Sequence, residues 1–265
     1  MKSANALSIL KSVLAISLGL AYGAAMAQPQ AATQAQGKEK SDTTVVLVHG
    51  AFADGSSWNK IIPLLQAKGL KVVSVQNPLT SLSDDVAATK RVIDAQIGRV
   101  VLVGHSWGGT VITQAGNDDK VSSLVYVAAF APSEGQSVAD LGKDYPTPPG
   151  FGKLKSDDGF LTLTEEGIQK DFAQDLPAVQ TKLMAVTQGP VRAANFEEKV
   201  AVASWKNKPS WYIVATKDHM IQPALQTAMA KKIGATTVSL PTSHVPMASA
   251  PKDVAAVIIA AAEKQ

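Results

Sequence analysis

The 265-residue sequence contains no cysteine, which excludes both disulfide bonds and a cysteine nucleophile. Charged residues are also few, at 18%, and neither sign dominates, because 25 Lys and Arg are balanced by 22 Asp and Glu. This near balance gives no electrostatic reason to expect nucleic acid or an anionic membrane as a partner. Hydrophobic residues make up 46% of the chain, enough for the core of one large domain.

The N-terminal segment differs from the rest of the chain. Lys2 and Lys11 precede a short apolar run that ends in small residues, and this layout predicts a secretory signal peptide over residues 1–27, cleaved after Ala27. The run is short of the ~20 residues of a spanning helix, so a retained anchor is the weaker alternative and no stable membrane anchor is expected after processing. Residues 28–41 are polar and predict a flexible leader. We therefore expect an exported protein, periplasmic or secreted.

From residue 42 to residue 265, short apolar runs alternate with longer amphipathic stretches. The runs are continuous and rich in β-branched residues, as in strands buried on both faces of a parallel sheet. The sequence therefore predicts an α/β domain with a mostly parallel, doubly wound sheet and helices on both sides. Strands are expected within residues 43–50, 70–78, 99–106, 120–130, 208–218 and 235–244. Helices are expected at residues 56–69, capped by Ser56 or Ser57, at 81–98, from 108 onward and at 251–265.

This alternation breaks between residues 132 and 205. Proline, glycine and charged residues are frequent there, and short helical patterns follow through residues 176–188. We expect this segment to be a small lid inserted over the sheet, within one domain that spans residues 42–265.

The stretch Gly-His-Ser-Trp-Gly-Gly stands where the third expected strand gives way to a helix. Gly104 and Gly108 flank Ser106 at the spacing of a tight turn that exposes the serine hydroxyl at the edge of the sheet. The helix that follows would place its N-terminal amides and positive dipole end beside any charge that develops there. Ser106 is therefore the candidate nucleophile.

A serine hydroxyl needs a base to activate it, and the chain has four histidines. His244 follows the sixth expected strand, at the carboxyl edge of the sheet where ligands bind, and it is the candidate base. His105 adjoins the serine and is expected to point into the packing of the turn. His49, at the end of the first strand, is expected to support the site, and His219 to be a loop residue.

The base in turn needs an acid that orients it. Asp218 lies just past the fifth expected strand, between Ser106 and His244 in chain order, and is the candidate acid. Glu134, just past the fourth strand, is its rival. The alternative for Asp218 is an ordinary surface or helix-capping role.

An oxyanion intermediate needs two backbone amides aimed at its negative charge. One candidate donor is the amide of Trp107, directly after the serine. The other is the amide of Ala51, in the loop after the first strand, with the neighbouring Phe52 as its alternative.

The substrate pocket is expected to draw on the first-strand loop and on the lid. Its candidate residues are His49, Phe52, Phe151 and Phe160. The lid also carries Phe172 and Leu183, but apolar residues of this kind more often form a lid's own core.

After the expected signal peptide, essentially the whole chain resembles the α/β-hydrolase superfamily. The resemblance is carried, in this order, by VVLVHGAFADGSSW, VVLVGHSWGGTVI, WYIVATKDHMIQPALQTAMA and SHVPMASAPKDVAAVI. Within the superfamily the chain looks like the small-lid branch of plant methyl-ester hydrolases, hydroxynitrile lyases and many exported bacterial esterases. The resemblance implies a triad of Ser106, Asp218 and His244, oxyanion amides at Ala51 and Trp107, and neither a cofactor nor a metal.

The lyases of that branch depend on a lysine near the acid and on a threonine after the first-strand histidine. Here Lys217 stands one position too early, and Gly50 occupies the place of the threonine. The resemblance therefore favours hydrolysis over the lyase reaction.

We expect a serine hydrolase that cleaves a small carboxylic ester or related acyl compound through an acyl-serine intermediate. One alternative is a cofactorless lyase or a perhydrolase on the same fold. Another is a non-catalytic periplasmic module that binds its ligand unchanged. The pattern of residues indicates neither the substrate nor an oligomeric state.

Overall fold

The structure is a computed structural model, and it describes residues 42–264. The predicted signal peptide (1–27) and leader (28–41) lie outside the described residues.

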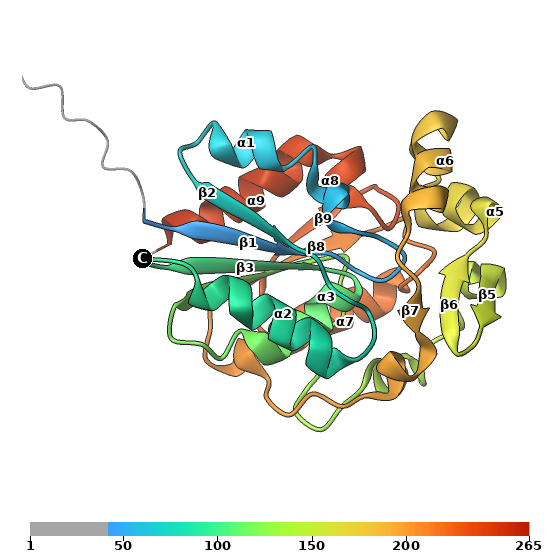
Figure 1. The fold of residues 1–265 in the computed structure, drawn as a ribbon, viewed down its shortest axis with the longest axis horizontal. Helices are drawn as coiled ribbons and strands as arrows, with labels where there is room; N and C mark the ends of the chain where they lie inside the picture. The colour runs from blue at the N-terminus through green and yellow to red at the C-terminus, as the bar shows by residue number, and fades with distance from the viewer. Residues whose placement is uncertain (1–41, 265) are drawn as a thin grey trace, which may run out of the picture. The chain divides into compact units, whose positions relative to one another are not determined.

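Six strands form one sheet in the order β2-β1-β3-β4-β8-β9 (Figure 1). Every pairing between these strands is parallel, which confirms the predicted α/β fold class. Each strand falls within one of the predicted apolar runs. The strands are β1 (Thr44–Val48), β2 (Lys71–Val75), β3 (Val100–His105), β4 (Val121–Val127), β8 (Ser210–Ala215) and β9 (Thr236–Leu240).

Helices cover both faces of this sheet, as predicted. In Figure 1, α1 (Ile62–Gln66) and α9 (Pro251–Glu263) lie above the sheet, whereas α2 (Leu82–Asp94) and α3 (Trp107–Ala115) lie below it. The helix α7 (Pro223–Lys232) packs on β8. Covered in this way, β1 and β3 are buried along their whole length, whereas the edge strand β9 is largely exposed. The continuous apolar runs therefore belong to the middle of the sheet.

The start of α2 agrees with the sequence, but its end does not. Ser81 caps the helix, and its hydroxyl accepts a hydrogen bond from the amide of Asp84 at 2.9 Å. The helix ends at Asp94, four residues before the predicted stop at Gly98. Gly98 has a φ of +88°, and a Cβ there would lie 2.3 Å from the carbonyl oxygen of Asp42. This glycine therefore serves the turn into β3 and not the helix end.

The helix predicted at residues 56–69 is wrong as one continuous element. The segment forms a 3₁₀ helix, η1 (Gly55–Trp58), and then the short α1. Asp54 caps η1 through a hydrogen bond from Ser56 N–H, so neither Ser56 nor Ser57 is the cap. Pro63 explains the break, because it has no N–H and its ring would clash with the carbonyl four residues earlier in a continuous helix. It is tolerated in the first turn of α1.

Residues 132–205, called the insertion below, connect β4 to β8 and lie beside the carboxyl ends of the strands (Figure 1). The insertion contains three strands that were not predicted. They form an antiparallel sheet of β5 (Leu154–Asp157), β6 (Phe160–Leu163) and β7 (Val191–Arg192). Its helices are α4 (Val138–Gly142), α5 (Glu165–Gly167) and α6 (Ala178–Thr187), with short turns η2 (Pro149–Lys153), η3 (Ile168–Phe172, a π-helix), η4 (Ala193–Glu197) and η5 (Ser204–Lys206).

The two ends of the insertion are joined to each other. The indole N–H of Trp205 donates to the carbonyl oxygen of Pro132 at 2.9 Å, and the amide of Gly135 donates to the carbonyl of Val200 at 2.8 Å. The chain therefore leaves the sheet and returns to it through neighbouring points.

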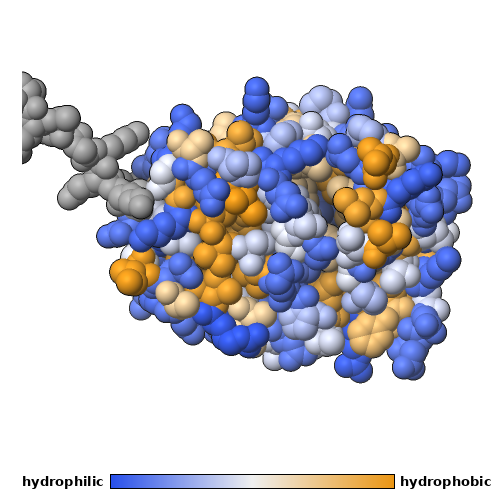
Figure 2. Space-filling view, turned by 45° about the horizontal axis from the view of Figure 1, so that its top comes forward, coloured by the Kyte–Doolittle hydropathy of each residue, from blue (hydrophilic) through white to orange (hydrophobic). Residues whose placement is uncertain are grey.

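The helix α6 exposes apolar side chains on the surface of the insertion. Val179, Leu183 and Val186 are 75%, 62% and 81% exposed. Figure 2 shows apolar residues on this side of the molecule, at the right of the view. Across residues 42–264, no helix combines the length and the hydropathy needed to cross a membrane.

Candidate active site

Ser106 stands at the turn between β3 and α3. Its φ of 52° and ψ of −119° lie outside the regions that non-glycine residues usually occupy, and such a conformation costs about 1–3 kcal/mol. The turn is closely packed, because a Cβ at Gly104 would lie 2.5 Å from the oxygen of Gly108, and one at Gly108 would lie 2.4 Å from the oxygen of Val48. Glycine at both positions therefore lets the backbone hold Ser106 in its strained conformation.

His244 and Asp218 lie at the ends of neighbouring strands and meet through their side chains. The imidazole Nδ1 is 2.7 Å from Asp218 Oδ2, and the two side chains are 1% and 0% exposed. A carboxylate only accepts hydrogen bonds, so Nδ1 carries the proton and Nε2 is left as the basic nitrogen.

Asp218 is itself held by three further donors. Its Oδ1 accepts from the amides of Met220 at 2.7 Å and Ile221 at 3.0 Å, and its Oδ2 accepts from Gln226 Nε2 at 2.7 Å. These bonds fix the carboxylate in one orientation toward His244. The rival acid Glu134 lies elsewhere, in an exposed ion pair with Lys206 at 3.1 Å.

Ser106 and His244 line the same cavity, which has a volume of ≈ 410 Å³. Ala51, Phe52 and Phe151 line it as well. Much of the remaining wall is apolar and comes largely from the insertion and from the loop after β8. These residues include Phe130, Val138, Tyr145, Leu154, Leu161, Phe196, Met220, Ile221 and Leu225.

Two residues predicted for the pocket lie outside its wall. The His49 ring is turned into the protein, where Nε2 accepts from the amide of Asn77 at 2.9 Å and Nδ1 donates to the carbonyl of Gly50 at 2.8 Å. Burial lowers the pKa of His49, which keeps the ring neutral. Phe160 lies on β6, opposite Asp157 and Arg192. His49 is therefore a structural link between two loops, and Phe160 belongs to the small antiparallel sheet.

His105 supports the backbone of His244. Its Nε2 donates to the carbonyl oxygen of His244 at 2.7 Å, and the two rings are 4.8 Å apart. Burial, together with the nearby His244, lowers the pKa of His105 well below its ordinary value, so the ring is neutral. His219 has a different partner, Asp171, at 3.2 Å from its Nδ1, and its side chain is 43% exposed.

The backbone amides of Ala51 and Trp107 are available as donors. Among residues 42–264, neither amide donates to a protein acceptor. The next residue in the loop, Phe52, has a φ of 58°, so this loop also contains a strained turn. Both amides belong to segments that border Ser106: Trp107 follows it, and a Cβ at Gly50 would lie 2.7 Å from its Cβ.

Asp85, which was not predicted as a site residue, contacts the residue that follows Ser106. Asp85 is fully buried on α2, where Oδ2 accepts from the indole N–H of Trp107 at 2.7 Å and Oδ1 accepts from the amide of Leu79 at 2.8 Å. The carboxylate thus connects the residue after Ser106 to the loop before α2. The one local signal was an acidic residue on the apolar face of a predicted amphipathic helix.

Burial raises the pKa of Asp85 to about 6, against the lowering effect of its two hydrogen bonds. An unfolded aspartate titrates near about 3.9, so between about pH 4 and about pH 6 the folded protein keeps a proton that the unfolded chain has released. The stability that this proton confers is lost as the pH rises through that range. We therefore expect wild type to lose roughly 2 kcal/mol relative to Asp85→Asn between about pH 4.5 and about pH 7.5 in denaturant unfolding.

The neighbouring Asp84 provides a matched control for this experiment. It is exposed, and hydrogen bonds from Thr80 and Ser81 lower its pKa. Asp84→Asn keeps Asp85, so above about pH 5 it should lose stability relative to Asp85→Asn just as wild type does. Parallel stability profiles for wild type and Asp85→Asn would contradict the assignment to Asp85.

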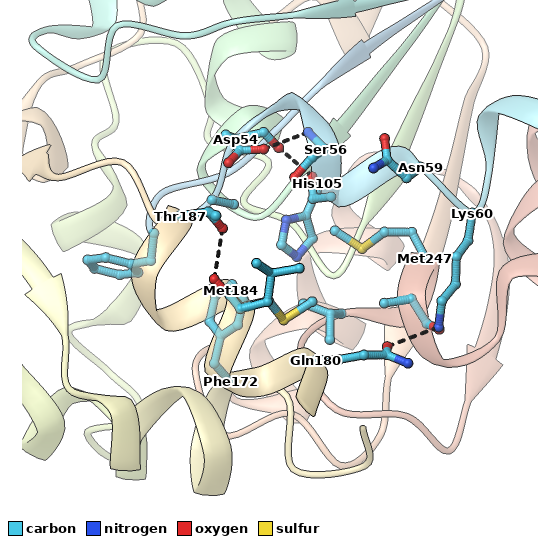
Figure 3. Close-up of a pocket in the computed structure, with 16 residues that line it drawn as sticks. Asp54, Ser56, Asn59, Lys60, His105, Phe172, Gln180, Met184, Thr187 and Met247 are labelled. Carbon is cyan, nitrogen blue, oxygen red and sulfur yellow. Dashed lines mark hydrogen bonds between the residues drawn. The ribbon is translucent and has the colours of Figure 1, made fainter. Parts of the chain in front are cut away.

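A second cavity of ≈ 230 Å³ lies between η1, α6 and α8 (Pro246–Ser249), and Figure 3 shows its walls. Phe52 lines both cavities. At one end, Lys60 Nζ donates to the carbonyl of Ala248 at 2.8 Å and to Gln180 Oε1 at 3.2 Å. No group of three or more His, Asp or Glu side chains within residues 42–264 is arranged to hold a metal ion.

Comparisons with known proteins agree with this architecture. A model of the alpha/beta hydrolase family matches residues 45–257. The chain is 26% identical over 254 residues to a pyrethroid hydrolase of Sphingobium wenxiniae, covering 82% of this chain and 86% of that protein. It is 27% identical over 251 residues to methylesterase 2 of Arabidopsis thaliana, covering 81% and 94%. The crystal structure of polyneuridine aldehyde esterase has a similar fold, with a TM-score of 0.72 and 19% identity over 82% of this chain and 98% of that one.

Proposed function

Because the chain belongs to the alpha/beta hydrolase family, we propose that it hydrolyses carboxylic esters of small molecules with Ser106 as the nucleophile. One observation carries this proposal: Ser106, on a strained turn, and His244, which is paired with the buried Asp218, line one cavity. The names of the relatives agree, because one is a hydrolase by name and the plant methylesterases are esterases by name. On the features of residues 1–27, we also propose that the protein is exported.

The proposed reaction begins at the serine hydroxyl. Ser106 Oγ attacks the ester carbonyl carbon while His244 Nε2 accepts the hydroxyl proton, and Asp218 stabilises the imidazolium that forms. The amides of Ala51 and Trp107 donate to the oxyanion. When the intermediate collapses, His244 returns the proton to the departing alkoxide, which leaves as an alcohol.

Water completes the cycle. His244 takes a proton from a water molecule, whose oxygen attacks the acyl-serine carbonyl through a second oxyanion. Collapse of this intermediate releases the carboxylic acid and returns the proton to Ser106. The neutral state of His105 supports this scheme, because a second charge beside His244 would oppose formation of the imidazolium.

The cavity suggests the class of ester. Its volume of ≈ 410 Å³ lies within the range of small-molecule sites, and its wall is mainly aromatic and aliphatic. An ester with at least one apolar part would bury that part against Phe151, Leu161 and Phe196. We therefore propose an apolar small-molecule ester as the substrate.

Covalent labelling tests the nucleophile. A fluorophosphonate reacts with a serine that an adjacent base activates, so we expect one adduct per chain, on the peptide that contains Ser106, together with hydrolysis of a short-chain nitrophenyl ester. Intact-mass and peptide mass spectrometry measure the adduct. His244→Ala is the control, because it keeps the serine, removes the base and should abolish labelling.

The outcomes separate the remaining alternatives. Ester turnover without an adduct on Ser106 would contradict the proposed nucleophile. A ligand retained unchanged, with neither labelling nor turnover, would favour a binding module. Trapping of an acyl-serine from an ester substrate would count against the lyase reaction.

A further inference from the structure

One short segment of the insertion, residues 171–175, contacts both loops that carry the acid and the base. These loops follow β8 and β9 and reach Asp218 and His244, respectively. The mechanism above uses no residue of the 171–175 segment. Its contacts are specific and lie on both sides of the histidine–carboxylate pair.

On the side of the base, Asp175 holds the residue that precedes His244. Asp175 Oδ2 accepts from the amide of Ser243 at 2.8 Å, and Oδ1 accepts from the Ser243 hydroxyl at 2.6 Å. Oδ1 also accepts from the hydroxyl of Ser249 in α8, at 2.8 Å. One carboxylate therefore ties the loop before His244 to the helix after it.

On the side of the acid, two residues of the segment hold the neighbours of Asp218. Gln174 Nε2 donates to the carbonyl oxygen of Lys217 at 2.6 Å. Asp171 Oδ1 lies 3.2 Å from His219 Nδ1. The residues directly before and after the candidate acid are thus both held by the insertion.

Between these two sides, Phe172 packs against the base itself. Its ring meets that of His244 edge to face at a centroid distance of 5.1 Å, and that of His105 at 6.3 Å. Phe172 is 2% exposed, so it leaves little room for the His244 ring to turn away.

We propose that the 171–175 segment positions the catalytic pair, and that Asp175 is the positioning residue for His244. The inference rests on the proposed function of Ser106 and His244. Proton transfer requires the imidazole within hydrogen-bond reach of the serine, and a displacement of about 1 Å costs on the order of 100-fold in rate. Because Asp175 acts on the loop of the base and does not line the cavity, its loss lowers kcat and leaves KM nearly unchanged.

Asp175→Ala tests the proposal through kinetics. We expect kcat for a nitrophenyl ester, and the rate of fluorophosphonate labelling of Ser106, to fall on the order of 10-fold, with KM changed less than about 2-fold. Asp157→Ala is the matched control, because Asp157 is an exposed carboxylate on β5 of the insertion that forms no ion pair with residues 42–264. A double-mutant cycle with Ser243→Ala should be non-additive, because the two side chains share a hydrogen bond.

A spectroscopic measurement decides the inference without turnover. The proton between His244 Nδ1 and Asp218 should give a downfield ¹H resonance, which Asp175→Ala shifts or broadens and Asp157→Ala leaves in place. Wild-type kcat and an unchanged resonance in Asp175→Ala would overturn the positioning role while the proposed function stands. If wild type neither labels nor turns over ester, the proposed function fails, and the resonance alone decides the role of Asp175.

Discussion

Ser106→Ala is expected to lower kcat for a short-chain nitrophenyl ester by on the order of 10⁴- to 10⁶-fold. The variant removes the atom that attacks the carbonyl, and water must then attack it directly. The amides of Ala51 and Trp107 remain, so a residual acceleration over the uncatalysed reaction is expected. The fold should persist, because Ser106 packs through its backbone, whose carbonyl accepts from the amides of Gly109 and Phe130. Initial rates and circular dichroism of the purified variant measure the two effects.

Ser56→Ala is the matched control for this experiment. Ser56 is an exposed serine that lines the second cavity, and its hydroxyl has no hydrogen-bond partner among the described residues. Its loss should leave the rate unchanged. A Ser106→Ala variant that retains more than about one-hundredth of the wild-type rate would require a different nucleophile.

Asp218→Asn is expected to lower kcat by about 10⁴-fold. In wild type, Oδ1 accepts hydrogen bonds from two backbone amides. The side-chain oxygen of the introduced asparagine must therefore take the place of Oδ1. Its NH₂ group would then face His244 Nδ1, which already carries a proton. The imidazole must move that proton to Nε2 and thereby loses the basic nitrogen that faces the cavity.

Glu134→Gln separates the two candidate acids in the same assay. Glu134 is 60% exposed and, within residues 42–264, pairs only with Lys206, so its variant should change kcat less than about 2-fold. If Glu134→Gln lost activity and Asp218→Asn kept it, the acid role would pass to Glu134. Glu134→Gln should cost little stability, whereas Asp218→Asn turns a donor toward Gln226 Nε2 and should cost about 1–3 kcal/mol, which urea unfolding measures.

Much of the fold follows from local patterns in the sequence. The β1 and β3 strands consist mainly of apolar residues in a row, and such strands are stable in the middle of a sheet that is covered on both faces. The start of α2 follows from Ser81 and Asp84 alone. By contrast, the break at Pro63 was a local signal that the prediction of one long helix ignored.

The strands of the insertion could also have been predicted in part. Asp158 and Gly159 both have positive φ and form the turn of the β5–β6 hairpin, and an Asp-Gly pair is a strong hairpin signal. The strands themselves are short and half-polar, so their apolar pattern was weak. The β7 strand has only two residues, and α6 lies between it and its partner β6 in the chain. No local pattern in the sequence therefore marks β7 as a strand.

The same division holds in the candidate site. Ser106, Asp218 and His244 were proposed because each follows a predicted strand, and parallel strands end at one edge of a sheet. The contact between Asp85 and Trp107 and that between Asp175 and Ser243 join residues far apart in the chain. No periodicity or spacing encodes such pairs, because they depend on how two separately formed elements pack.

The joined ends of the insertion bear on how new specificities could arise in this protein. Trp205 and Pro132 close the segment at its base, so its length can change without altering where the chain meets the sheet. Lengthening a closed loop costs little, about 0.6 kcal/mol per doubling. Exchange of the whole segment at this junction would thus alter most of the substrate-facing wall in one step. Each replacement segment would need a hydrogen-bond acceptor for Ser243, the part that Asp175 plays here.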